Sequence, residues 1–82
     1  MQKLIYTVFK IHADETAEVT TQFTIEGSEA RTFFEHSKKI LRSLNYQEHY
    51  IEQRTFERSI FVNGDTEVKL VYTNRGNTHY VS

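Results

Sequence analysis

Histidine is the residue type in this chain best suited to metal ligation or proton transfer. The four histidines fall on three different predicted elements, at His12, His36, His49 and His79. No two of them show the H-x-x-H, H-x-x-x-H or H-E-x-x-H spacing that brings two imidazoles to one metal ion. Scattered surface histidines are the simpler interpretation, and we expect no metal site.

Carboxylates, hydroxyls and thiols are the other groups capable of acid–base or covalent chemistry. No pair of acidic residues lies in an apolar setting that would favour general acid catalysis, and Asp14, Glu15 and Glu18 read as a solvated turn. There is no G-x-S-x-G motif and no cysteine. Each glycine coincides with a predicted turn and none belongs to a phosphate-binding loop. We therefore expect a protein that is not an enzyme and has no cofactor.

One amphipathic segment, from Ser28 to Asn45, is predicted to be the only helix. Ser28 is a suitable N-cap and Asn45 a suitable stop. Apolar or small residues recur at the i, i+3, i+4, i+7 spacing of one helix face, at Ala30, Phe33, Phe34, Ser37, Ile40, Leu41 and Leu44. Solvent is predicted to surround the charged residues of the outer face, which are Arg31, Glu35, Lys38, Lys39 and Arg42.

Strand-like segments flank this helix on both sides. Lys3 to His12 is apolar on both alternating faces, whereas Ala17 to Glu26 alternates cleanly between apolar and polar residues. Further strands are predicted at Tyr50 to Val62, Thr66 to Thr73 and Thr78 to Val81. The sequence therefore predicts one α+β domain, residues 1–82, with a single amphipathic helix packed on one face of a four- to five-stranded antiparallel sheet, in the order β-β-α-β-β(-β).

Register decides which face of the first strand is buried, because a one-residue slip moves every side chain to the other face. A three- or five-residue loop pairs Ile5, Phe9 and Ile11 with Ile25, Thr21 and Val19. A two- or four-residue loop pairs Tyr6 and Val8 with Phe23 and Thr21 instead. We favour the first register because it buries more β-branched area.

For the later hairpin, a three-residue loop at Asn63-Gly64-Asp65 aligns the apolar sets best, with Ile60 facing Val68, Arg58 facing Leu70 and Phe56 facing Tyr72.

A single helix covers one face of a sheet, so the other face is expected to be open. In the favoured registers the helix buries Ile5, Phe9, Ile11, Val19, Phe23, Ile25, Phe56, Ile60, Val68 and Leu70. Five apolar side chains then point outward as a partner-binding patch, namely Leu4, Tyr6, Val8, Phe61 and Val71. The alternative is that the chain tail or the Tyr46 to Tyr50 segment covers this face. The open patch predicts a module that docks this sheet face, or a strand edge, onto a partner protein or onto a second copy of itself as a homodimer.

Nucleic-acid binding is the second hypothesis. Residues 36–82 contain seven Lys or Arg against five Asp or Glu, although the formal net charge of the chain is −1. Lys38, Lys39 and Arg42 would contact phosphates or an acidic partner, and aromatic side chains such as Tyr6, Phe61 and Tyr80 would stack on bases. Lysines favoured by the helix dipole on a solvated face explain the same residues, so this hypothesis ranks below protein binding.

The first residues contain too many interruptions by Lys and Thr for a signal peptide, and no segment is apolar enough to span a membrane, so we expect a cytoplasmic protein with no membrane partner. An 82-residue domain without cysteine or proline resembles, in size and composition, the small phage-encoded anti-defence inhibitors that include anti-CRISPR proteins. The resemblance implies an inhibitor of a host defence complex and transfers no residue roles.

Overall fold

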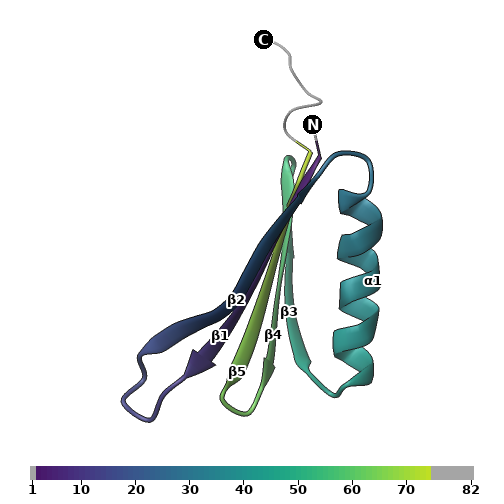
Figure 1. The fold of residues 1–82 in the computed structure, drawn as a ribbon. Helices are drawn as coiled ribbons and strands as arrows, with labels where there is room; N and C mark the ends of the chain where they lie inside the picture. The colour runs from purple at the N-terminus through teal and green to yellow at the C-terminus, as the bar shows by residue number, and fades with distance from the viewer. Residues whose placement is uncertain (1, 75–82) are drawn as a thin grey trace.

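The structure is a computed structural model and describes residues 2–74. These residues form one helix on a five-stranded antiparallel sheet, so the predicted α+β class and the order β-β-α-β-β-β are confirmed (Figure 1). The elements are β1 Lys3–Ile11, β2 Ala17–Glu26, α1 Ala30–Ser43, β3 Gln47–Glu52, β4 Phe56–Asn63 and β5 Thr66–Thr73. The predicted strand from Thr78 to Val81 lies outside the described residues.

Helix α1 begins two residues later than Ser28, and Glu29 is its N-cap, without a side-chain capping hydrogen bond. Its C-terminal end follows the Schellman pattern. Asn45 adopts a positive φ of 68°, the Asn45 amide donates to the Arg42 carbonyl at 3.1 Å, and the Tyr46 amide donates to the Leu41 carbonyl at 3.1 Å. Asn45 therefore ends the helix as predicted and turns the chain directly into β3.

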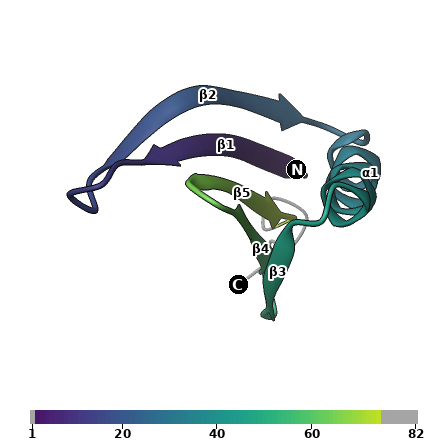
Figure 2. The ribbon, with the colours of Figure 1, turned by 90° about the horizontal axis from the view of Figure 1, so that it is seen from below.

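The sheet has the strand order β2-β1-β5-β4-β3, so β2 and β3 are its two edges. Seen along the helix, the sheet curves around α1, with β2 on one side of the helix and β3 on the other (Figure 2). The helix packs mainly against the central strands β1 and β5. It consequently has two flanks, one toward each sheet edge.

The favoured register of the β1–β2 hairpin is wrong, and the other register is observed from Lys3 to Val8 of β1. Tyr6 pairs with Phe23 and Val8 with Thr21, but beyond an irregularity after Val8, Phe9 pairs with Val19. Five residues connect Ile11 to its partner Ala17. This loop has the odd length that the favoured register predicts. However, the extra residue at the bulge, Thr20, shifts the register by one and inverts the faces of β2 on one side of the bulge relative to the other.

The later hairpins also differ from prediction. Gly64, with a φ of 62°, and Asp65 form a two-residue turn between Asn63 and Thr66, so the predicted three-residue loop is wrong. Phe61 consequently faces Val68, and Ile60 faces Lys69. The segment predicted as one strand from Tyr50 to Val62 is divided into β3 and β4 by a tight turn, in which the Gln53 amide donates to the Phe56 carbonyl at 2.8 Å.

These shifts reverse the predicted faces of the sheet. The buried hydrophobic residues between α1 and the sheet are Leu4, Ala30, Phe34, Leu41, Phe61, Val68, Leu70 and Tyr72, against which Tyr6, Val8, Ile25 and Tyr46 pack. Of the ten residues predicted to lie under the helix, Val68 and Leu70 are buried there and Ile25 packs against them. Most of the others lie on the opposite face of the sheet, which is turned away from α1. The prediction that they lie under the helix is therefore wrong.

No helix of the described residues is long and apolar enough to cross a membrane. Helix α1 has 14 residues, and cations on one of its sides interrupt any continuous apolar surface.

Candidate protein interface

The predicted partner-binding patch is largely inside the protein. Leu4 and Phe61 are 0% exposed, and Tyr6 and Val8 pack against the core. Only Val71 points away from the helix. The predicted exposure of the other four residues is wrong because the bulge in β2 and the two-residue turn after β4 place them under α1.

The open face consists of the alternate residues of the same strands. Its cross-strand rows follow from the register, and one row contains Ile5, Val71, Arg58 and Ile51. No described element covers this face, because the Tyr46 to Tyr50 segment enters the edge strand β3 instead of folding over the sheet. The apolar side chains of the face are partly exposed or exposed, and they are Ile5, Phe9, Ile11, Val19, Ile51, Phe56, Ile60, Val62 and Val71.

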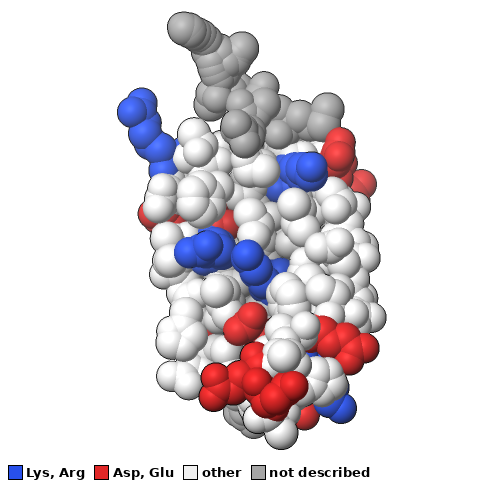
Figure 3. All heavy atoms as spheres, turned by 90° about the vertical axis from the view of Figure 1, so that its left-hand side faces the viewer, with Lys and Arg blue, Asp and Glu red and all other residues white. Residues whose placement is uncertain are grey.

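Two basic residues lie inside this apolar surface. Arg58 is paired across the strands with Val71, and Lys69 with Ile60. Figure 3 views the molecule from this side and shows Lys and Arg side chains on a mostly uncharged surface, with most of the visible Asp and Glu at its lower end and the others at its sides. The buried Nε of Arg58 has no hydrogen-bond acceptor among residues 2–74. The face therefore combines apolar contact area with cations near its middle.

A shallow hollow lies at one end of the open face. It is lined by residues from the N-terminal end of β1, the start of β4 with the residue before it, and the end of β5, namely Lys3, Ile5, Thr55, Phe56, Val71 and Thr73. Its lining surface is mostly apolar, which suits an inserted apolar side chain better than a polar small molecule.

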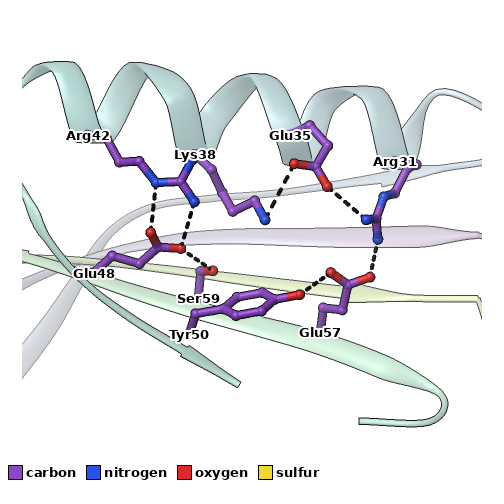
Figure 4. Close-up of polar contacts among 8 residues, drawn as sticks. All are labelled: Arg31, Glu35, Lys38, Arg42, Glu48, Tyr50, Glu57 and Ser59. Carbon is purple, nitrogen blue, oxygen red and sulfur yellow. Dashed lines mark hydrogen bonds and ion pairs between the residues drawn. The ribbon is translucent and has the colours of Figure 1, made fainter. Parts of the chain in front are cut away.

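The flank of α1 toward β3 is charged. Arg31 donates to Glu57 of β4 and lies 2.8 Å from Glu35, one helical turn away. The Tyr50 hydroxyl of β3 donates to the other oxygen of Glu57 at 2.5 Å (Figure 4). Burial alone would raise the pKa of Glu57, but the hydrogen bonds from Tyr50 and Arg31 outweigh it and lower this pKa. The hydrogen bond between Tyr50 and Glu57, together with burial, raises the pKa of Tyr50.

The second half of this flank centres on Glu48 of β3. Arg42 Nε donates to Glu48 at 2.7 Å, and the Ser59 hydroxyl donates to Glu48 at 3.1 Å (Figure 4). Burial opposes ionisation of Glu48, but these two hydrogen bonds lower its pKa overall. Between the two halves, Lys38 is 6% exposed, with its Nζ 3.4 Å from Glu35 and 4.6 Å from the centre of the Tyr50 ring.

These contacts define a charged flank of α1: Arg31, Glu35, Lys38, Arg42, Glu48, Tyr50, Glu57 and Ser59. Lys38 is thus buried, and the prediction that it lies on a solvated helix face is wrong, whereas Arg42 is exposed as predicted and also pairs with Glu48. Lys39 is exposed as predicted. Phe61, predicted to stack on bases, is fully buried, and Tyr80 lies outside the described residues.

The flank of α1 toward β2 is apolar. Phe33, Ile40 and Leu44 were predicted to be buried, but they are 41%, 45% and 56% exposed. Phe33 meets Phe23 of β2 edge to face at 6.2 Å between ring centres, and Phe23 stacks on Tyr6 at 4.8 Å. Phe23, Phe33, Ile40 and Leu44 form what we call the apolar flank.

The sequence contains a signal for the way α1 is turned toward the sheet, with one charged and one apolar flank. Arg31, Lys38 and Arg42 share one side of the helix with Glu35, next to the apolar stripe rather than opposite its centre. Strand β3 and the start of β4 carry Glu48, Tyr50, Glu57 and Ser59 on the face toward the helix. Matching the two polar sets would have predicted a polar contact between α1 and this sheet edge.

Among residues 2–74, no three His, Asp or Glu side chains lie together as metal ligands would. His12 lies 2.9 Å from Glu18 across the β1–β2 hairpin, and both side chains are exposed. His79 lies outside the described residues.

Comparison with protein-family models, with curated proteins and with solved structures finds no match for this chain.

Proposed function

We propose that this protein is a small non-catalytic binding module that docks the open sheet face onto a partner protein. The partner's contact surface is apolar and carries acidic side chains. One observation supports the proposal most: nine apolar side chains lie at least partly exposed on one sheet face that no described element covers.

The arrangement of the face supports protein binding in two ways. Ile5, Ile60 and Val71 are β-branched and stand on a hydrogen-bonded backbone, so they lose little conformational freedom when a partner covers them. Arg58 and Lys69 lie among these residues and provide cations that an acidic partner group can approach.

Two isoleucine substitutions test the proposal with a matched control. Ile60→Ser removes an apolar side chain from the middle of the open face, and Ile40→Ser removes the same side chain from the apolar flank. We expect a partner captured by the unaltered chain, then purified and measured by calorimetry, to bind the Ile60 variant at least about tenfold more weakly, because the lost contact is worth roughly 1.5 kcal/mol or more. The Ile40 variant should bind as the unaltered chain does. Equal binding by both variants would refute docking through this face.

Nucleic acid is the competing ligand for a face with Arg58, Lys69 and the aromatic rings of Phe9 and Phe56. A gel shift with mixed single-stranded oligonucleotides at low salt separates the two classes, because binding to phosphates weakens steeply as salt rises. A salt-sensitive shift that Arg58→Gln abolishes would replace the proposed protein partner by a nucleic acid.

An inhibitor of a host defence complex is the narrower form of the proposal, motivated by the size and composition of the chain. Its test is whether producing the chain in a host with an active CRISPR system restores infection by a targeted phage. Unchanged interference would remove this narrower form and leave the general binding proposal to the calorimetric experiment.

A further inference from the structure

Strand β2 has a free backbone edge. It is the first strand in the sheet order β2-β1-β5-β4-β3, so only β1 pairs with it in the described residues. The Gly27 amide donates to the Gln2 carbonyl at 2.8 Å, and residues bonded to the neighbouring strand alternate along an antiparallel strand. The backbone groups of Gln22 and Thr24 therefore point away from β1, toward solvent.

This edge lacks most devices that prevent strands from pairing with other chains. Val19 to Ile25 is seven residues without a charge, and the chain has no proline. The bulge at Thr20 twists the half of β2 nearest the β1–β2 loop. The half from Thr21 to Glu26 remains regular, and all of it except the partly buried Ile25 is exposed.

The apolar flank continues from this edge. Phe23 projects from β2 toward the helix side of the sheet, where it touches Phe33, and it is 39% exposed. Ile40 and Leu44 follow Phe33 along the same stripe of α1, at intervals of seven and four residues. A strand that pairs with β2 would lie beside these four side chains.

We propose that the free edge of β2 pairs antiparallel with β2 of a second copy of this chain, forming a two-fold dimer with a continuous ten-stranded sheet. The geometry commits to a strand as occupant, because only a strand satisfies the outward groups of Gln22 and Thr24 together. The sequence of β2 commits to a second copy, because it is complementary to itself.

The self-complementarity selects a register. Pairing centred on Phe23 places Phe23 against its symmetry mate, Gln22 against Thr24, and Thr21 against Ile25, with Glu26 opposite Thr20. Pairing centred on Gln22 instead would place Glu18 against Glu26, which is unfavourable. The centre at Phe23 brings the two rings together and leaves no like charges opposed.

The exposed area is consistent with a dimer that needs both the apolar flank and strand pairing through β2. With about two fifths to one half of each side chain exposed, the apolar flank offers on the order of 300 Å² per copy, compared with about 800 Å² per partner in a standard interface. The flank alone is too small. Strand pairing has to supply the rest of the interface.

Sedimentation across a wide concentration range tests the dimer, with Thr24→Pro as the decisive variant. The amide of Thr24 points outward, so proline removes no hydrogen bond from the monomer but deletes two across the symmetric junction. We expect the dimer Kd to rise about tenfold or more, while Thr24→Val, which keeps the amide, leaves it unchanged. A monomer at all concentrations, or a dimer equally stable in both variants, would overturn the proposal.

Cross-linking tests the register without relying on stability. Residues opposed in a non-hydrogen-bonded antiparallel pair have Cα atoms about 4.5 Å apart, within the range that a disulfide spans. Because the chain has no cysteine, Phe23→Cys should form a covalent dimer on mild oxidation. Val19→Cys, on the other side of the bulge, should not. Cross-linking of Val19→Cys alone would contradict this register.

The proposal is independent of partner binding by the open face. Ile40→Ser weakens the dimer and spares the partner, whereas Ile60→Ser does the reverse. Loss of the dimer in the Ile60 variant alone would place the second copy on the open face and overturn pairing through β2.

Discussion

The two flanks of α1 solve the same problem, covering the side of a helix near a sheet edge, in opposite ways. Toward β3, long charged side chains reach the sheet and pair with Glu48 and Glu57 in a network that leaves Lys38 almost fully buried. Toward β2, Phe33 meets Phe23 edge to face, and Ile40 and Leu44 remain exposed. The charged flank is complete within one chain, whereas the apolar flank is left with area for another chain.

The contrast has a physical cause. A hydrogen-bonded ion pair requires specific partners at fixed distances, and leaving one member buried alone is unfavourable, so such a network joins the two layers in one arrangement. Apolar contact has no such directionality and is equally well completed by a second molecule. The charged flank therefore supports the fold, and the apolar flank is available for association.

Removing a carboxylate from the charged flank should produce the largest effect. Glu57→Ala leaves both Arg31 and the Tyr50 hydroxyl without their shared acceptor, and we expect the free energy of unfolding to fall by about 2–3 kcal/mol in urea denaturation. Glu18→Ala, which removes an exposed pair with His12 in the β1–β2 hairpin, should cost no more than about 0.5 kcal/mol. Equal losses would show that the network is not what secures this side of α1.

Acidification should weaken the charged flank without mutation. The pKa values of Glu48 and Glu57 are lowered in the folded chain, so as the pH falls the unfolded chain binds protons at these carboxylates first. The free energy of unfolding should therefore decrease below about pH 5, the region where unfolded carboxylates begin to protonate.

The double variant Glu48→Gln, Glu57→Gln is the control for this pH dependence. It should be less stable at neutral pH but show a shallower loss between neutral and acidic pH. An unchanged slope would assign the acid sensitivity to other carboxylates.

Truncating the aromatic contact of the apolar flank should have an intermediate effect. Phe23→Ala removes a ring that stacks on Tyr6 and meets Phe33, but that is already 39% exposed. We expect a loss of about 1–2 kcal/mol, measured by denaturation at a concentration low enough to keep the chain monomeric. A loss as large as that of Glu57→Ala would mean that both flanks secure the fold equally.

Replacing the outer residues of the apolar flank should have the smallest effect on a single chain. Ile40→Ser and Leu44→Ser change side chains that are about half exposed, so each should alter monomer stability by no more than about 1 kcal/mol. Thermal melts at low concentration check this. A larger loss would mean that these residues pack within the monomer.

Several features of the fold follow from local sequence patterns. The element order, the single helix between Ser28 and Asn45, and the positive-φ stop at Asn45 could be predicted because capping, periodicity and turn residues act over a few positions. The candidate interface could be predicted only as a kind of surface, an open sheet face, because one helix covers one side of a sheet.

The residues of that surface were decided by tertiary structure. Strand β1 is apolar on both faces, so its own pattern does not say which side the helix covers. The bulge at Thr20 and the two-residue turn after Asn63 made that choice, and each shifts a register by one residue and inverts every side chain beyond it. Burial of Lys38 likewise depended on Glu48, Tyr50 and Glu57 arriving from distant strands. The sequence by itself determined which elements form, through short-range energetics, and only the packed sheet decided which faces meet.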